Sequence, residues 1–279
     1  MAVVLWVAVI YTTIPFVRML QEWFVARWSP FFIGLGVAIA LVSAATVTLV
    51  GLSKNSGGLS LATAVWISAI AVLLLLWTYD LRHSPEEAVH FLEYGVLAVL
   101  VYRALRLTVP DASIYLGGAL IGLLVGTVDE VIQWISPGRY WDWRDIVLNG
   151  GAGALVQLAL WRIGPRYAST IGAGSMRTVL RLTAAQLLLL TLCLANTPQR
   201  VEWYAPRLPG CNHLTSTINP MAEFGHRHTM PGIGSFKSRL TLAELRAEDT
   251  VRGSEVAAVL DTYRRRYNEF LENWPVGSD

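Results

Sequence analysis

Most acidic side chains of the first 196 residues lie in three short stretches, together with one histidine and two arginines. The stretches read EEAVHFLEYG (Glu86–Gly95), DEVIQ (Asp129–Gln133) and PGRYWDWRDIVLN (Pro137–Asn149) and hold seven of the ten acids before residue 197. Histidine, carboxylates and arginine are sufficient for acid–base catalysis, metal-assisted hydrolysis or the binding of a charged ligand. The spacing therefore predicts a polar site in an otherwise apolar chain.

Within these stretches, ten residues are candidates for ligand binding. No catalytic residue is assigned, because no serine or cysteine accompanies the cluster and the chain has no HExxH, GxSxG or P-loop motif. The candidates are Glu86, His90, Tyr94, Asp129, Glu130, Gln133, Arg139, Asp142, Asp145 and Asn149.

Two sets of residues are weaker candidates for a metal site. His90 with Glu130 and Asp142 has the imidazole and carboxylate donors that suit zinc or manganese. In the C-terminal region, four further side chains form a C-x-H and an H-x-H pair, but their spacing matches no standard zinc finger. The four side chains are Cys211, His213, His226 and His228. We predict no cofactor and no firm metal site.

The composition indicates the class of protein that holds these residues. The 279 residues are 54% hydrophobic and 15% charged, and the mean hydropathy is +0.46. A soluble domain carries about 25% charged residues, so these values exclude an ordinary soluble enzyme, and a net charge of +2 does not indicate a nucleic-acid partner.

Long uncharged runs predict an all-α polytopic membrane protein with about seven transmembrane helices. A span needs about 20 apolar residues, and Phe31–Leu52 and Leu61–Tyr79 meet this. Met1–Val17 predicts a first span ending near Pro15, and Arg18–Pro30 an interfacial helix. The remaining spans are Ala88–Tyr102, Ala112–Ile135, Asp145–Trp161 and Leu182–Asn196.

The chain is expected to divide into four parts. Residues 1–60 hold the first membrane helices, 61–163 a helical core, 164–196 the last membrane helix and 197–279 a polar tail. The tail is expected to consist of loops with helices at Leu240–Arg246 and Glu255–Trp274.

Helix geometry brings the three stretches together. Asp129, Glu130 and Gln133 lie on the same helix face as Gly126, which belongs to a small-residue packing stripe, and alternate spans return to the same side of the membrane. Lys and Arg in short loops favour an inner N-terminus and an outer C-terminus, so the cluster is expected to face outward. A structural alternative is that these groups only hold the helices together.

The three stretches also resemble the VanZ-like family, named for a protein linked to teicoplanin resistance. That family has Asp-Lys-x-x-His-x-x-x-Tyr, then Asp-Glu-x-x-Gln, then Pro-Gly-Arg followed by Asp, Asp and Asn. The similarity covers roughly Leu61–Trp161, and Glu87 replaces the usual Lys. The other matching positions are Glu86, His90, Tyr94, Asp129, Glu130, Gln133, Pro137, Gly138, Arg139, Asp142, Asp145 and Asn149.

The resemblance implies a multi-pass protein of the cytoplasmic (inner) membrane that acts in the cell envelope. We expect the cluster to bind an envelope lipid, a cell-wall precursor or a lipoglycopeptide, with membrane lipids as partners and no nucleic acid. An intramembrane hydrolase or transferase acting on a lipid-linked substrate and a non-catalytic scaffold are the alternatives. The oligomeric state is left open.

Overall fold

In the computed structural model the chain divides into two compact units, Met1–Ala222 and Glu223–Asp279. The structure describes residues 1–25, 27–29, 31–55, 59–137, 139, 141–165, 167, 171–215 and 221 of the first unit. In the second it describes 226–230, 234–238, 242–243, 245–247, 249–250, 253, 258, 261–262 and 264–265.

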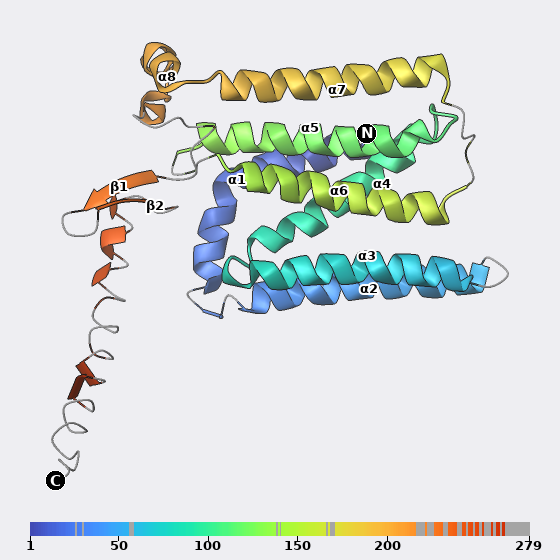
Figure 1. The fold of residues 1–279 in the computed structure, drawn as a ribbon, viewed down its shortest axis with the longest axis horizontal. Helices are drawn as coiled ribbons and strands as arrows, with labels where there is room; N and C mark the ends of the chain where they lie inside the picture. Colours follow the sequence, from blue (N-terminus) through green and yellow to red (C-terminus); the bar gives the residue numbers. More distant parts are fainter. Residues whose placement is uncertain are drawn as a thin grey trace, which may run out of the picture. The chain divides into compact units, whose positions relative to one another are not determined.

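The first unit is a helical bundle, as predicted (Figure 1). Six of its helices are long and apolar enough to cross a membrane, and the first helix holds a shorter apolar stretch, Ala2–Val17. An all-α polytopic fold is thereby confirmed. The helices are α1 (Ala2–Val25), α2 (Phe31–Asn55), α3 (Leu61–Asp80), α4 (His90–Leu105), α5 (Ser113–Ile135), α6 (Trp143–Ile163), α7 (Ala173–Leu194) and α8 (Pro198–Tyr204), with 3₁₀ turns at Leu81–His83, Glu87–Val89, Ala205–Arg207 and Asn212–Leu214.

The helix boundaries differ from the prediction at both ends of the bundle. One helix, α1, continues through Pro15 to Val25 without the expected break, and the interfacial position of the residues after Val17 stays a prediction. Figure 1 shows a bend along α1, consistent with the lost hydrogen bond and steric clash that an internal proline introduces. The last span begins at Ala173 rather than Leu182, because its first three turns accommodate Arg177 and Arg181.

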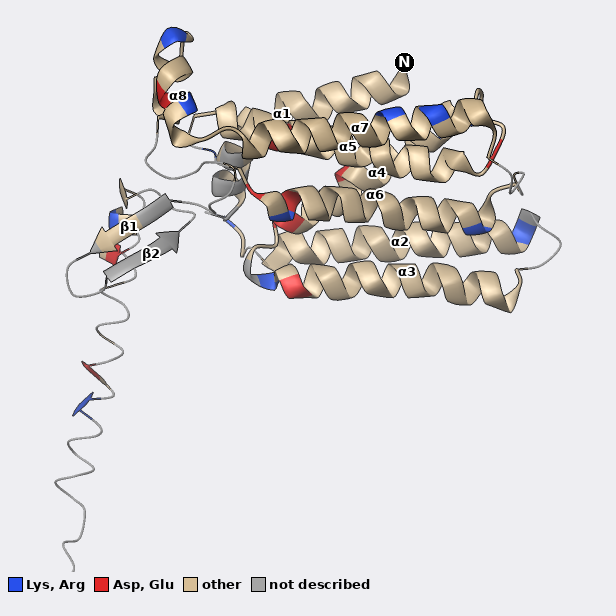
Figure 2. Ribbon diagram, turned by 45° about the horizontal axis from the view of Figure 1, so that its top comes forward, with Lys and Arg blue, Asp and Glu red and all other residues tan. Residues whose placement is uncertain are grey.

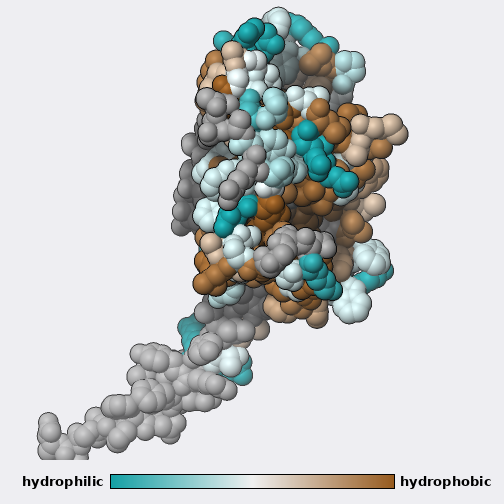
Figure 3. All heavy atoms as spheres, turned by 90° about the vertical axis from the view of Figure 1, so that its right-hand side faces the viewer, coloured by the Kyte–Doolittle hydropathy of each residue, from teal (hydrophilic) through white to brown (hydrophobic). Residues whose placement is uncertain are grey.

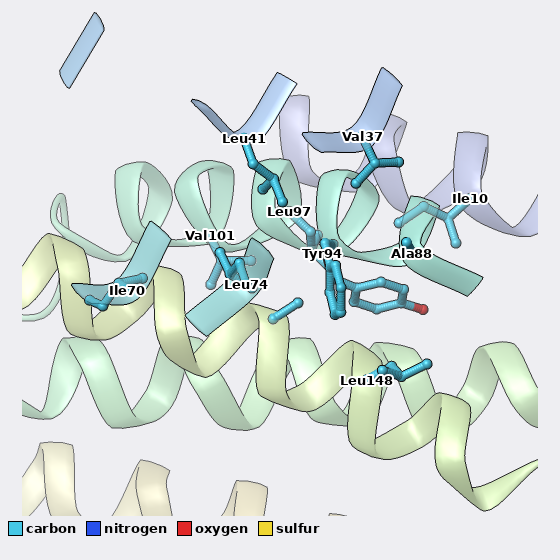
Figure 4. Close-up of a cluster of buried hydrophobic side chains, with 12 residues drawn as sticks. Ile10, Val37, Leu41, Ile70, Leu74, Ala88, Tyr94, Leu97, Val101 and Leu148 are labelled. Carbon is cyan, nitrogen blue, oxygen red and sulfur yellow. The ribbon is translucent and has the colours of Figure 1, made fainter. Parts of the chain in front are cut away.

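Helix α5 lies at the centre of the bundle and packs most extensively against α6, with α4 and α7 also beside it. The apolar core is formed mainly by α1 to α4 and α6. Figure 4 shows the labelled side chains Ile10, Leu97 and Leu148 around Tyr94, whose hydroxyl points toward Ala88, in the 3₁₀ turn that precedes α4. Tyr94 thus connects the apolar core to the polar end of the bundle.

Glycines on α5 allow α6 to approach closely. A Cβ on Gly126 would lie 2.7 Å from Cβ of Asn149, and one on Gly118 would lie 2.7 Å from Cδ of Gln157. The two pairs are eight residues apart on both helices, so they fix one antiparallel register. Gly122, between them, would meet nothing within 4 Å.

Charged residues gather mainly toward the ends of the bundle helices (Figure 2). The N-cap and first turn of α6, at one end, hold Asp142 and Asp145. Seen from the opposite end, hydrophilic side chains lie among hydrophobic ones (Figure 3). This pattern suits helices whose middles lie in hydrocarbon.

The second unit contains a two-stranded antiparallel hairpin that the sequence did not predict. Strands β1 (His226–Met230) and β2 (Gly234–Ser238) pair with His228 opposite Phe236. Helical conformation is found at 242–243, 245–247, 249–250, 253, 258, 261–262 and 264–265, and the rest of the predicted tail helices lies outside the described residues.

Candidate polar site

The turn between α5 and α6 is fastened by hydrogen bonds to Glu130. Its Oε1 accepts a bond from Nε2 of Gln133 (2.8 Å), and its Oε2 accepts one from the backbone N–H of Asp142 (2.9 Å). Arg139 donates to Oε1 of Gln133. Its bond to Gln133 orients an amide that in turn donates to Glu130.

Asp142 begins α6 as its N-cap. Its Oδ1 accepts the backbone N–H of Arg144 at 2.9 Å, which satisfies a donor that the first helical turn leaves unpaired. The Arg144 side chain lies 3.5 Å from Asp142 and 3.6 Å from Glu87, which precedes α4. All three polar stretches of the sequence therefore meet at one end of the bundle.

A second group of polar side chains is packed differently. The Tyr94 hydroxyl lies beside the Asp129 carboxylate as its side-chain partner, but the hydroxyl, Oδ1 of Asp129 and both amide atoms of Asn149 are buried and make no well-formed hydrogen bond among the described atoms. Asp129 lies beside Tyr94, His90 and Glu93, and its Oδ2 receives only a long bond (3.4 Å) from Gln133. Buried polar groups are nearly always paired, so this group has unused binding capacity.

The start of α4, which adjoins this group, is partly exposed. Nδ1 of His90 lies 3.3 Å from Oε2 of Glu93, and their side chains are 17% and 28% exposed. Asp129 is 2% exposed and Tyr94 is fully buried. Helix α1 covers another side, where the Tyr11 hydroxyl donates to the backbone carbonyl of Val125 (3.0 Å).

The remaining candidates lie around these two groups. Glu86 is half-buried in the turn before α4, where its backbone carbonyl accepts the N–H of Val89. Asp145 lies in the first turn of α6 and its charge acts on Glu130 of α5. Asn149 packs against Gly126, one turn before Asp129.

Residues after α7 cover the same end of the bundle. Val201, Ala205, Leu214 and Met221 form an apolar cluster with residues of α5, α6 and α7. This cluster includes Trp141, which directly precedes the α6 N-cap. The segment following the last span thereby packs beside the polar turn.

Of the proposed metal ligands, Cys211 and His213 belong to the first unit. Within the described ranges, no three His, Cys, Asp or Glu side chains are placed to hold a metal ion. Nε2 of His213 is 3.0 Å from the carbonyl oxygen of Ile135, and Sγ of Cys211 is 3.8 Å from that of Pro209. His226 and His228 lie on β1 in the second unit.

An apolar groove of about 320 Å³ lies apart from the polar groups, between α3, α5 and α6. Its walls include Trp77, Leu120 and Val147, and its lining residues carry no charge. The groove opens away from the bundle axis along membrane-spanning segments, so hydrocarbon chains of the surrounding lipid are suited to fill it.

The sequence analysis missed Asp111, at the opposite end of the bundle. Its Oδ1 accepts the N–H of Ser113 (3.0 Å) and its Oδ2 that of Gly172 (3.1 Å), the N-cap of α7. Hydrogen bonds, first from the Ser113 side chain and then from Ser175 and the two backbone amides, lower the pKa of Asp111 from 3.8 to about 2. The Asp-x-Ser pattern before α5 was the available signal, since it is typical of a helix-capping turn.

A family model that matches part of the chain shows to which family the chain belongs. It is described as VanZ/LLP1 and covers residues 3–164, more than half of the chain. The chain belongs to the VanZ/LLP1 family. The family region begins in α1 and ends after α6, so it includes the N-terminal helices that the resemblance in the sequence motifs had left out.

All three polar stretches lie inside this VanZ/LLP1 region, whereas α7 and the second unit follow it. No curated protein and no solved structure is significantly similar to the chain.

Proposed function

We propose that this VanZ-family membrane protein binds an amphiphilic component of the cell envelope at its polar cluster. The candidate ligands are a membrane lipid, a cell-wall precursor or a lipoglycopeptide. By analogy with the family's namesake, binding would lower susceptibility to teicoplanin-like antibiotics.

The unpaired polar atoms of Tyr94, Asp129 and Asn149 carry this proposal. A cluster that serves only to hold helices together is expected to satisfy its buried groups, as the hydrogen bonds around Glu130 do. Unsatisfied groups that adjoin partly exposed side chains are instead typical of a site that is completed by a ligand.

Orientation is part of the proposal, with the cluster on the outer face of the cytoplasmic membrane. The end of the bundle away from the cluster carries Lys54, Arg103, Arg106, Arg162 and Arg177 near helix ends. The cluster end carries Arg27, Arg82, Arg139 and Arg144, of which the last two are engaged by the cluster itself. The positive-inside rule therefore favours an outward cluster.

Purification in mild detergent, followed by mass analysis of retained lipids and precursors, tests the proposal. We expect the wild-type protein to retain an amphiphile that Tyr94→Phe loses. Because the contact of the Tyr94 hydroxyl with Asp129 is not a well-formed hydrogen bond among the described atoms, its removal is expected to lower the melting temperature only slightly.

Glu130→Gln is the matched structural control. It replaces an oxygen that accepts the Asp142 N–H, and losing a bond to a charged group costs about 1.5–3 kcal/mol. This variant is expected to melt earlier but to retain the ligand while folded. Equal retention by the wild type and Tyr94→Phe would contradict the proposal, whereas a chemically altered retained lipid would favour the hydrolase or transferase alternative.

A further inference from the structure

We propose that Asp129, with Tyr94 beside it, binds a primary ammonium group of the ligand. This inference rests on the proposed function and adds the chemical class that the site recognises.

The arginines of the cluster are already committed to protein groups, which argues against a phosphate or carboxylate as the recognised group. Arg139 donates to Gln133, and Arg144 lies against Glu87 and Asp142. An anion would have to displace these contacts before it could be bound bidentately.

The unpaired group carries excess negative charge. Asp129 and Glu93 are acidic, and His90 is the basic side chain beside both. Even a protonated His90 leaves one negative charge unbalanced. Since an isolated charge is costly inside a membrane bundle, a cationic ligand suits this place.

The buried acceptors of this group need hydrogen-bond donors, and among cations a primary ammonium supplies them best. The Asp129 carboxylate, the Tyr94 hydroxyl beside it and the Asn149 amide of the neighbouring helix are buried and keep unfilled acceptor positions. A primary ammonium has three N–H donors. A quaternary ammonium has none and is usually held by several aromatic faces, whereas the ring of Tyr94 is packed in the apolar core (Figure 4).

Metal ions are less suited to the same place. Across the part of the chain that the structure describes, no three acidic, histidine or cysteine side chains are arranged as ligands. Directional N–H donors fit one carboxylate oxygen and neutral oxygens better than a divalent ion, which prefers several oxygen ligands with more than one carboxylate.

Two sources could supply the ammonium: the headgroup of an aminophospholipid or a soluble amine. Both would approach from the start of α4, where the partly exposed side chains of His90 and Glu93 lie 3.3 Å apart and would have to separate.

The experiment compares lipids that differ only at the headgroup nitrogen. Full-length, delipidated protein in detergent is titrated with phosphatidylethanolamine, its N-acetylated form, phosphatidylcholine and phosphatidylglycerol of identical acyl chains, and binding is measured by native mass spectrometry. A parallel arm measures thermal stabilisation by ethanolamine against tetramethylammonium chloride at equal ionic strength.

We expect phosphatidylethanolamine to bind about tenfold or more tightly than its N-acetylated form and phosphatidylcholine, because a charge-assisted hydrogen bond is lost in both. Asp129→Asn should abolish the preference. Asp111→Asn, an equally conservative change of a buried acid at the other end of the bundle, should keep it. Stabilisation by ethanolamine without lipid preference would support the ammonium site and identify a soluble amine as the source.

Three results distinguish failure of the ammonium inference from failure of the proposed function. Equal binding of all four lipids, with no effect of ethanolamine or Asp129→Asn, would overturn both this inference and the proposed lipid site. Tight binding of phosphatidylglycerol that depends on Tyr94 or Asp129 would overturn the ammonium inference and leave the proposed function standing. Should Asp129→Asn fail to fold, Tyr94→Phe takes its place, and an unchanged headgroup preference in that variant would overturn the inference.

Discussion

Asp129 and Glu130 are neighbours in the sequence, yet they differ in what surrounds them. Successive residues of a helix point about 100° apart, so Glu130 is directed to the α5–α6 turn and Asp129 to Tyr94 and His90. Glu130 accepts two well-formed hydrogen bonds, whereas Oδ1 of Asp129 accepts none among the described atoms. The first residue is therefore suited to stabilise the fold and the second to bind a ligand.

The lowered pKa of Asp111 leads to a prediction for this single residue. Its folded pKa of about 2 lies below the usual 3.8, so it stabilises the folded state fully above pH 4, and this contribution is lost as the pH falls through about 2. Asp111→Asn should lower the melting temperature at neutral pH and remove this part of the acid dependence. Melting curves of both proteins in detergent between pH 2 and 6 test it, and parallel curves for the two proteins would contradict the prediction.

At the scale of helices, the contact between α5 and α6 decides how the polar stretches meet. Asn149 packs over Gly126 and Gln157 over Gly118, and the same register places the start of α6 beside the end of α5. A change in this register would separate Glu130 from Asp142, which are joined only because these two helix ends adjoin.

Gly126→Ala and Gly122→Ala form a matched pair that tests this packing. The new Cβ at Gly126 would lie 2.7 Å from Asn149, whereas at Gly122 it would meet nothing within 4 Å. We expect Gly126→Ala to lower the free energy of unfolding by about 1–3 kcal/mol through overpacking, and Gly122→Ala to be neutral or slightly stabilising because alanine favours helix. Equal melting temperatures for the two variants would contradict the proposed register.

At the scale of the whole molecule, the membrane topology decides which compartment the cluster faces. The six long helices, with α1 before them, give seven crossings if α1 also spans the bilayer. The cluster and the segment after α7 lie at the same end of the first unit. Whichever side holds this segment therefore also holds the polar site.

Reporter fusions test that arrangement. A phosphatase that is active only outside the cytoplasm, fused after Ala222, where the first unit ends, is expected to be active. The same reporter inserted after Leu107, in the α4–α5 connection at the other end of the bundle, is expected to be inactive. The reverse pattern would place the cluster in the cytoplasm and remove the basis for an envelope ligand.

The sequence by itself determined the membrane class, the helical fold and the residues of the polar cluster. These follow from local composition, because a long apolar run must form a helix in hydrocarbon and charges within such runs must face the protein interior. Helix ends at Val25 and Ala173 were missed, since a proline or two arginines can be accommodated in a helix by its surroundings.

Only the tertiary structure divided the cluster into a satisfied and an unsatisfied part. Which atom of Glu130 or Asp129 receives a donor depends on the register of α5 against α6 and on the position of α4. The same holds for Asp111, whose partner Gly172 is 61 residues away. Such contacts join residues that are distant in the chain, and no local pattern encodes them.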